Sequence, residues 1–164
     1  MKKQLDITVR NAVLKAMAIH ISNSQDAILA ANKIDLENYS GDDISMQDRL
    51  KVDQSKIDGM ILSLEQLAAE PDPLGIERFQ TTHENGMNIS NKTAPFGTIL
   101  IIYESRPDVT VEAAGIAFKS GNSILLKGGK ESLHSNLLLV DLWHKSLEEN
   151  DCDTNWISYL QFNR

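Results

Sequence analysis

The first seventy residues place apolar side chains at every third or fourth position, which is the spacing of amphipathic helices. This pattern predicts four successive helices between about residues 5 and 70, within an N-terminal helical segment that we assign to residues 1–74. Their apolar faces carry Val13, Leu14, Met17 and Ile21, then Ile28, Leu29 and Leu36, then Met46 and Leu50, and finally Ile57, Met60, Ile61, Leu64 and Leu67.

Polar and helix-breaking residues predict where these helices begin and end. Ser22 with Gln25 fits a capping box for the second helix, and Gly41 fits a helix stop. Asp53 is a good N-cap for the last helix, which we expect to end before Pro71.

Residues 75–94 change to a strand-like pattern on either side of Asn85-Gly86. An Asn-Gly pair readily supplies the two positive φ angles of a type I′ turn, so we predict a β-hairpin. Apolar and polar residues alternate poorly in it, which argues against a core sheet. Two interpretations stay open with equal weight: an arm that lies against another domain or subunit, and a plain surface hairpin.

From Pro95 onward, short apolar runs alternate with helical patterns. The predicted strands are TILIIY (98–103), SILLK (123–127) and WISYLQF (156–162), and the predicted helices are PDVTVEAAGIAFKS (107–120), which Pro107 opens and Gly121 closes, and ESLHSNLLLVDLWHKSLEEN (131–150). Continuous apolar strands ask for helices on both faces, so we expect residues 95–164 to form half of a doubly wound, Rossmann-like parallel sheet in an α/β protein. Its uncovered edges and apolar surface predict a larger unit or a partner that completes it.

Composition narrows the class of protein. A chain of 164 residues with 41% hydrophobic content suits a globular domain, and a net charge of -7 gives no basic footprint for nucleic acid or an anionic membrane. No apolar run approaches the ~18 residues of a membrane helix. A single cysteine cannot form an internal disulfide, so we expect a cytoplasmic protein.

The acidity is not spread evenly along the chain. Residues 95–135 carry equal numbers of cations and anions, so we expect any anionic ligand to bind in this segment. The charges are Arg106, Lys119, Lys127 and Lys130 against Glu104, Asp108, Glu112 and Glu131.

The loop after the first apolar strand is one candidate site, because ligands of open parallel sheets bind beyond the carboxyl ends of strands, near helix N-termini. Arg106 directly precedes the helix that Pro107 opens, and its forked guanidinium suits a carboxylate or phosphate. In the competing interpretation, Glu104 or Asp108 neutralises Arg106 in a solvated turn.

The loop after the second apolar strand is the other candidate. Gly128 and Gly129 allow close backbone approach or positive φ, and Lys127 and Lys130 supply cations that suit a phosphate or ribose. The pattern is neither G-x-G-x-x-G nor a Walker loop, so the residues alone favour a plain strand-to-helix turn.

Other catalytic and metal-binding arrangements are not indicated. Cys152 lies between Asp151 and Asp153, whose charges disfavour a thiolate, so we predict a raised pKa and no catalytic role for this thiol. The four histidines lack ligand spacing, and no G-x-S-x-G elbow is present, so we expect no metal site and no serine nucleophile.

One segment carries a family resemblance, through the pieces PFG, IYESRP, KSGN and LKGGKE in this order and spacing within residues 94–132. It resembles the start of the nucleotide-binding domain of the gamma-glutamyl phosphate reductase (glutamate-5-semialdehyde dehydrogenase) family, within the aldehyde dehydrogenase superfamily. The likeness covers essentially the whole chain, since the hairpin and three further stretches also match: ILAANKIDL, MQDRL and PDPLG.

The resemblance implies a reductase of proline biosynthesis, which converts L-glutamyl 5-phosphate, NADPH and a proton into L-glutamate 5-semialdehyde, NADP and phosphate. In this family a cysteine thiolate displaces phosphate, and hydride then reduces the thioester. That cysteine belongs to a later domain, so the resemblance places it beyond residue 164 and implies that these 164 residues alone are inactive.

The family's cofactor residues can be carried over by position. Lys127 matches the lysine that holds the adenine ribose, with Gly128 and Gly129 beside it in the same loop. Lys130 falls where many NAD-using relatives carry Glu, and a cation there favours the 2′-phosphate of NADP(H).

The first loop matches the family's nicotinamide loop through Tyr103, Glu104 and Ser105. The wider superfamily has P-W-N-F-P here, and this loop is one residue shorter, so we assign it no oxyanion role. Asp108 stands where relatives often have Asn and receives no role. We expect Arg106 to orient the anionic glutamyl phosphate.

Three hypotheses follow from these observations. The chain is the N-terminal part of an NADPH-dependent acyl-phosphate reductase, a stand-alone nucleotide-binding or regulatory module, or an interaction domain whose ribbon and sheet edge extend a partner's sheet. The hairpin is also a candidate homodimer surface.

Overall fold

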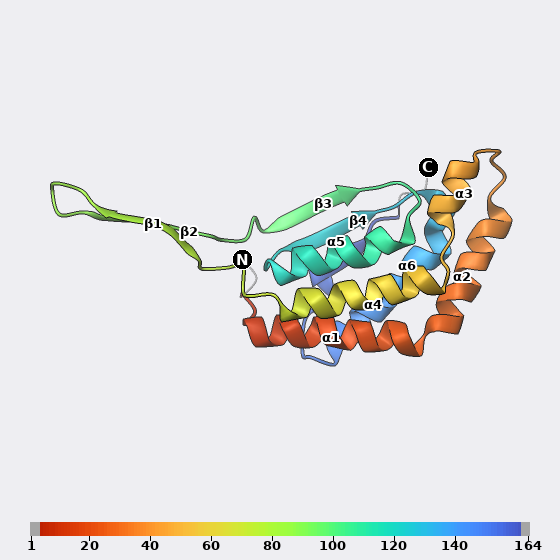
Figure 1. The fold of residues 1–164 in the computed structure, drawn as a ribbon, viewed down its shortest axis with the longest axis horizontal. Helices are drawn as coiled ribbons and strands as arrows, with labels where there is room; N and C mark the ends of the chain where they lie inside the picture. The colour runs from red at the N-terminus through yellow and green to blue at the C-terminus, as the bar shows by residue number, and fades with distance from the viewer. Residues whose placement is uncertain (1–3, 162–164) are drawn as a thin grey trace.

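The computed structural model describes residues 4–161 as a three-stranded parallel sheet, a helical layer and a projecting hairpin (Figure 1). In chain order the elements are α1 (Ile7–Asn23), α2 (Gln25–Asn38), α3 (Ile44–Leu50), α4 (Gln54–Ala69), β1 (Glu77–Thr82), β2 (Asn88–Lys92), β3 (Thr98–Ile102), α5 (Pro107–Lys119), β4 (Ser123–Lys127), η1 (Lys130–Ser132), α6 (Leu133–Glu148), η2 (Thr154–Trp156) and β5 (Ile157–Tyr159). None of the helices in this range has the length and apolar character needed to cross a membrane.

The predicted helix boundaries are confirmed at Asp53 and wrong at two other positions. Asp53 caps α4 by accepting a hydrogen bond from the Lys56 N–H at 3.1 Å. The capping box is wrong, because Ser22 lies inside α1 and α2 starts after Ser24 without a side-chain cap. Gly41 does not stop α2, which ends at Asn38 because Tyr39 is already extended, with ψ 114°.

The helices share one apolar core with the sheet. The predicted apolar faces of α1 and α4 are buried against each other and against α5, and they join the core side chains of β4, α6 and β5 in one cluster. Gly115 of α5 permits this close packing, since a Cβ there would lie only 3.2 Å from Cδ2 of Leu67. The helical segment therefore packs directly on the sheet's crossover helices.

Two buried cations fasten the segment after α4 to α1 and α5. The Arg10 guanidinium donates to Asp72 Oδ2 at 2.7 Å and also to the carbonyl of Lys119. The Lys119 ammonium donates to Asn11 Oδ1 and to the carbonyl of Glu70, both at 2.7 Å. Burial, followed by the charge of Arg10, lowers the pKa of Lys119 below its ordinary value.

The sheet confirms the predicted α/β class and the parallel strand pairing. Its order is β3-β4-β5, with Thr98 opposite Ser123 and Ile124 opposite Ile157. The third strand is shorter than predicted, and Phe162 lies outside the described residues. Gly121, with φ 71°, follows α5 and turns the chain toward β4 as predicted.

Helices cover one face of this sheet, whereas the apolar strands suggested helices on both. Both crossovers move in the same direction across the sheet, and right-handed crossovers therefore place α5 and α6 on the same side. Figure 1 shows α5, α4 and α1 stacked on that side. On the opposite side Leu100 is 51% exposed and Ile102 is 74% exposed.

The hairpin of β1 and β2 projects away from the core (Figure 1), and every residue of both strands is exposed. The predicted hairpin is confirmed, but its type I′ turn is wrong. His83 N–H donates to the Met87 carbonyl at 2.8 Å around a three-residue loop, in which only Gly86 has positive φ. The Asn85 side chain accepts from the Met87 N–H at 3.1 Å, a local bond that favours this alternative turn.

Candidate functional site

Two loops meet at the carboxyl edge of the sheet, and we call residues 103–106 and 127–131 together the rim. The Tyr103 N–H donates to the Lys127 carbonyl at 3.0 Å, which continues the pairing of β3 with β4. The buried Ser105 hydroxyl donates to Glu131 Oε2 at 2.7 Å. The structure therefore brings the two sequence-predicted loops into direct contact.

A chain of buried and partly buried hydrogen bonds connects the rim to α5, α6 and β5. The hydroxyls of Tyr103 and Thr110 share a bond of 2.7 Å, and Thr110 donates to Asn136 Oδ1 at 2.8 Å. The Asn136 amide then donates to Ser132 Oγ and to the Tyr159 hydroxyl, at 2.9 and 3.2 Å. Burial raises the pKa of Tyr103 far above its ordinary value, so its hydroxyl stays protonated and structural.

Sequence reasoning missed this support. The one available signal was the spacing of Ser132, which directly precedes α6, and Asn136 of its first turn, since both side chains are buried and lie four residues apart. Polar residues at such positions need buried partners, which the sequence does not identify.

The two rim glycines serve internal packing. A Cβ at Gly128 would lie 2.4 Å from Asn136 Nδ2, and a Cβ at Gly129 would lie 2.2 Å from Ser105 Oγ. Neither glycine has positive φ. The close approach that glycine permits is therefore made by the protein's own side chains. It allows the two rim loops to pack directly against each other.

The rim cations differ in exposure. The half-buried Lys127 ammonium donates to the Gly128 carbonyl at 3.0 Å, whereas Lys130 is exposed. Burial pushes the pKa of Glu131 upward, but the Ser105 hydrogen bond and the two lysine charges outweigh it and hold that pKa below its usual value. Glu131 is therefore a carboxylate that offsets part of the positive charge at the rim.

Asp35 of α2 caps the N-terminus of α6. Its Oδ1 accepts from the His134 N–H at 3.0 Å and lies 2.8 Å from Nδ1 of the same ring, and its Oδ2 accepts from the Ser135 N–H at 2.8 Å. These N–H groups would otherwise be available to an anion. Because Asp35 occupies them, these two N–H groups are not available to a ligand.

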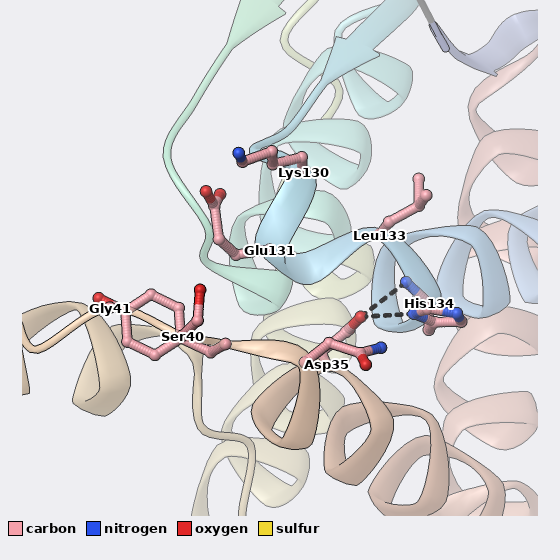
Figure 2. A pocket seen from close by; sticks show the side chains of 9 residues that line it. Asp35, Ser40, Gly41, Lys130, Glu131, Leu133 and His134 are labelled. Atoms are coloured by element: carbon pink, nitrogen blue, oxygen red, sulfur yellow. Dashed lines mark hydrogen bonds and ion pairs between the residues drawn. The ribbon is translucent and has the colours of Figure 1, made fainter. Parts of the chain in front are cut away.

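A cavity of about 470 Å³ adjoins the rim. It lies between the end of α2 and the start of α6, with Lys130 and Glu131 on one side and Ser40 and Gly41 on another (Figure 2). The hydrogen-bonded Asp35 and His134 also line it (Figure 2). The cavity is thus lined by charges of both signs, Lys130 on one hand and Asp35 and Glu131 on the other.

Arg106 and Glu104 have different ion-pair partners. Arg106 is exposed and pairs with Asp108 at 3.1 Å, as in the competing interpretation of this loop, while Glu104 pairs with Arg49 of α3. Asp108 Oδ1 is buried without a hydrogen-bond partner among the described residues. Asp108, which had no assigned role, therefore holds the Arg106 side chain.

Cys152 lies away from the rim. It follows α6 at the amino-terminal edge of the sheet, is buried, and its thiol donates to the Asn150 carbonyl at 3.3 Å. Burial and then the charge of Asp151 raise its pKa, as predicted. Within residues 4–161, no group of three His, Cys, Asp or Glu side chains could hold a metal ion.

Comparisons with known proteins point to one enzyme. No family model matches the chain. It is 42% identical over 154 residues to gamma-glutamyl phosphate reductase of Streptococcus suis, covering 93% of this chain and 37% of that protein. The crystal structure of gamma-glutamyl phosphate reductase from Thermotoga maritima superposes with a TM-score of 0.90 at 35% identity, covering 95% of this chain and 38% of that one.

A more distant structure shares the fold alone. Succinic semialdehyde dehydrogenase from Streptococcus pyogenes, solved in complex with NADP+, superposes with a TM-score of 0.72 at 16% identity, covering 99% of this chain and 32% of that one. The chain therefore spans less than two fifths of the length of each of these three proteins.

Proposed function

We propose that this chain, which is homologous to the N-terminal part of gamma-glutamyl phosphate reductases, forms the cofactor side of an NADPH-dependent reductase. Its reaction converts L-glutamyl 5-phosphate into L-glutamate 5-semialdehyde and phosphate. The observation that supports this most is the rim, where Lys127 and Lys130 lie beside residues 103–106 at the carboxyl edge of a parallel sheet.

The rim residues fit a phosphorylated dinucleotide by charge. Lys127, Gly128 and Gly129 would hold the adenosine part of NADP(H), and the exposed Lys130 would meet its 2′-phosphate. Bound there, the cofactor supplies a hydride for the reduction. Asp35 already caps α6, so lysine side chains, and no N–H group of residues 134 and 135, would neutralise the phosphate charge.

Residues 103–105 would face the nicotinamide. Tyr103 and Ser105 are each fixed by a hydrogen bond of 2.7 Å, so this loop has a defined shape before a ligand arrives. Such preorganisation favours a precise approach between donor and acceptor.

Arg106 would orient the acyl phosphate. Its ion pair with Asp108 holds the guanidinium at the mouth of the loop, and half of its side chain surface is exposed. A planar, permanently charged fork is suited to a phosphate or carboxylate.

The covalent step needs a thiol other than Cys152. This thiol is buried, has a raised pKa and lies at the edge of the sheet opposite the rim. We therefore infer that these 164 residues do not reduce the acyl phosphate on their own.

A second candidate function is a stand-alone nucleotide-binding or interaction module. The exposed Leu100 and Ile102, together with the fully exposed hairpin, favour it, because they offer apolar surface and strand edges to a partner. A homodimer through the hairpin belongs to the same set of proposals.

The deciding experiment runs the reaction in reverse. L-glutamate 5-semialdehyde, NADP+ and phosphate are supplied to the complete protein and, separately, to the 164 residues alone. NADPH formation is followed by the absorbance of the reduced nicotinamide. We expect turnover by the complete protein only. NADPH is also titrated against both samples, and tight binding without turnover in both would favour the second candidate.

A further inference from the structure

Residues 103–105 of the rim are each held by a side chain from a different element. The partners, in order, are Thr110 of α5, Arg49 of α3 and Glu131 of η1. Thr110 and Glu131 belong to the crossover connections that flank the sheet. Arg49 is different, because it comes from the N-terminal helices and reaches the loop from outside the sheet.

The backbone that carries Arg49 is fixed by a lysine. The Lys56 ammonium donates to the carbonyls of Asp48, Arg49 and Lys51, at 3.1, 3.2 and 2.6 Å. These carbonyls lie at the C-terminal end of α3, where a cation is favoured. Lys56 thus ties the end of α3 to the first turn of α4.

A buried asparagine fixes the same segment from the other side. Asn32 of α2 donates to the Leu50 carbonyl at 2.8 Å and accepts from the Val52 N–H at 2.7 Å. Its amide also lies 3.2 Å from the hydroxyl of Ser135, in the first turn of α6. Arg49 is therefore presented on a rigid support that is itself connected to α6.

We propose that Arg49 is a positioning residue for the rim: by pairing with Glu104, it holds residues 103–106 in place relative to the cations at 127 and 130. The inference rests on the proposed function. Both side chains of the pair are about half exposed or more, at 46% and 64%, so the pair contributes little to global stability. Its effect falls on where the loop lies.

The test uses the complete protein with four variants: Arg49→Gln, Glu104→Gln, the double variant, and Arg49→Lys. Lys33→Gln is the matched control, because it removes another exposed ion pair, Lys33–Glu37, on α2. The measurements are kcat, KM, the Kd of NADPH from its fluorescence, and melting temperature.

We expect Arg49→Gln to lower kcat by about five- to twentyfold, since a loosened loop misaligns the reacting groups. The Kd of NADPH should stay within about twofold, because Lys127 and Lys130 are unchanged. The double variant should be no slower than the slower single variant, and Arg49→Lys should recover part of the loss, since it keeps the charge but loses the fork.

Two results would overturn the inference: a kcat for Arg49→Gln within about twofold of the unmodified protein, or a loss that follows a fall in melting temperature absent from Lys33→Gln. If the unmodified protein does not reduce the acyl phosphate, the proposed function fails separately. Amide hydrogen exchange at residues 103–106 then decides the positioning role. Faster exchange in Arg49→Gln than in Lys33→Gln supports it, and equal exchange overturns it.

Discussion

Asp35 and Ser135 are joined by two hydrogen bonds, since Asp35 Oδ2 accepts from both the backbone N–H and the hydroxyl of Ser135, at 2.8 and 2.7 Å. The two residues are a hundred positions apart, and their contact anchors α2 to the first turn of α6. The position of the rim therefore depends partly on the N-terminal helices.

Replacing Asp35 by Asn should destabilise the protein by about 2 kcal/mol. The new amide NH2 is a donor, and it would face backbone N–H groups that now donate hydrogen bonds to the carboxylate. Chemical denaturation measures the change in unfolding free energy. Glu37→Gln, on an exposed position of the same helix, is the control and should change it by less than about 0.5 kcal/mol. An equal effect of both changes would contradict the capping role.

Gly128→Ala should destabilise the protein by about 1–3 kcal/mol, because the added Cβ would overlap Asn136 Nδ2 beneath the rim. Gly59→Ala in α4 is the matched control. A Cβ there meets nothing within 4 Å, so this change should stabilise the helix by roughly 0.5–1 kcal/mol. Thermal or urea unfolding that gives both variants the same sign would refute this account of Gly128.

Lys130→Glu should reverse part of the cofactor preference. A carboxylate repels a 2′-phosphate and accepts from a ribose hydroxyl, so the ratio of NADPH to NADH affinity should fall at least about tenfold. Fluorescence titration of both cofactors measures it. Lys15→Glu, an exposed site on α1, makes the same charge change away from the rim and should leave the ratio unaltered.

Cys152 should react slowly with Ellman's reagent in the folded protein. Burial and the Asp151 charge raise its pKa, so less thiolate is present at neutral pH than for a free thiol, and burial also restricts access. Denaturant should speed the reaction strongly. Rapid labelling of the native protein would contradict the burial seen here.

The Asp72 carboxylate should make the stability of the fold depend on pH in the acid range. Burial pushes its pKa upward, but the Arg10 hydrogen bond and further contacts outweigh it, so its folded-state pKa lies below the ordinary value of an aspartate. A depressed pKa stabilises the fold above the unfolded-state value, and that contribution disappears as pH falls through the folded-state value. The stability gap between Asp72→Asn and the unmodified protein should therefore be full near neutral pH and shrink below about pH 4.

Urea unfolding at a series of pH values measures this gap. Asp42→Asn, which removes an exposed carboxylate from the α2–α3 segment, is the control and should change stability by less than about 0.5 kcal/mol at neutral pH. A gap for Asp72→Asn that stays constant into acid would argue against the ion pair with Arg10.

The parallel sheet was predictable because its signals are local. β3 and β4 each contain a run of consecutive apolar residues, and Pro107 and Gly121 mark both ends of α5 within a few residues of these strands. The meeting of the two rim loops then follows from parallel pairing, which places the carboxyl ends of β3 and β4 at the same edge of the sheet. The hairpin was equally visible, although its turn depended on a side-chain bond of Asn85 that the Asn-Gly pattern alone does not reveal.

The rest of the site depends on partners that are distant in sequence. Asp35 and Arg49 look like ordinary surface charges on amphipathic helices, and nothing near them indicates a partner 55 or 100 residues away. In the sequence, the rim glycines suggested room for a ligand. Only the folded chain shows that the side chains of Asn136 and Ser105 already occupy this space.

The one-sided covering of the sheet bears on how such a protein is built. All the described helices that bury the strands lie on the face away from Leu100 and Ile102, and the apolar core closes there without help from the opposite side. A second layer can therefore pack on the exposed face of the sheet without disrupting this core. During synthesis, the helices and the covered face of the sheet can fold first. The folded unit then offers its exposed face, with Leu100 and Ile102, to a second layer.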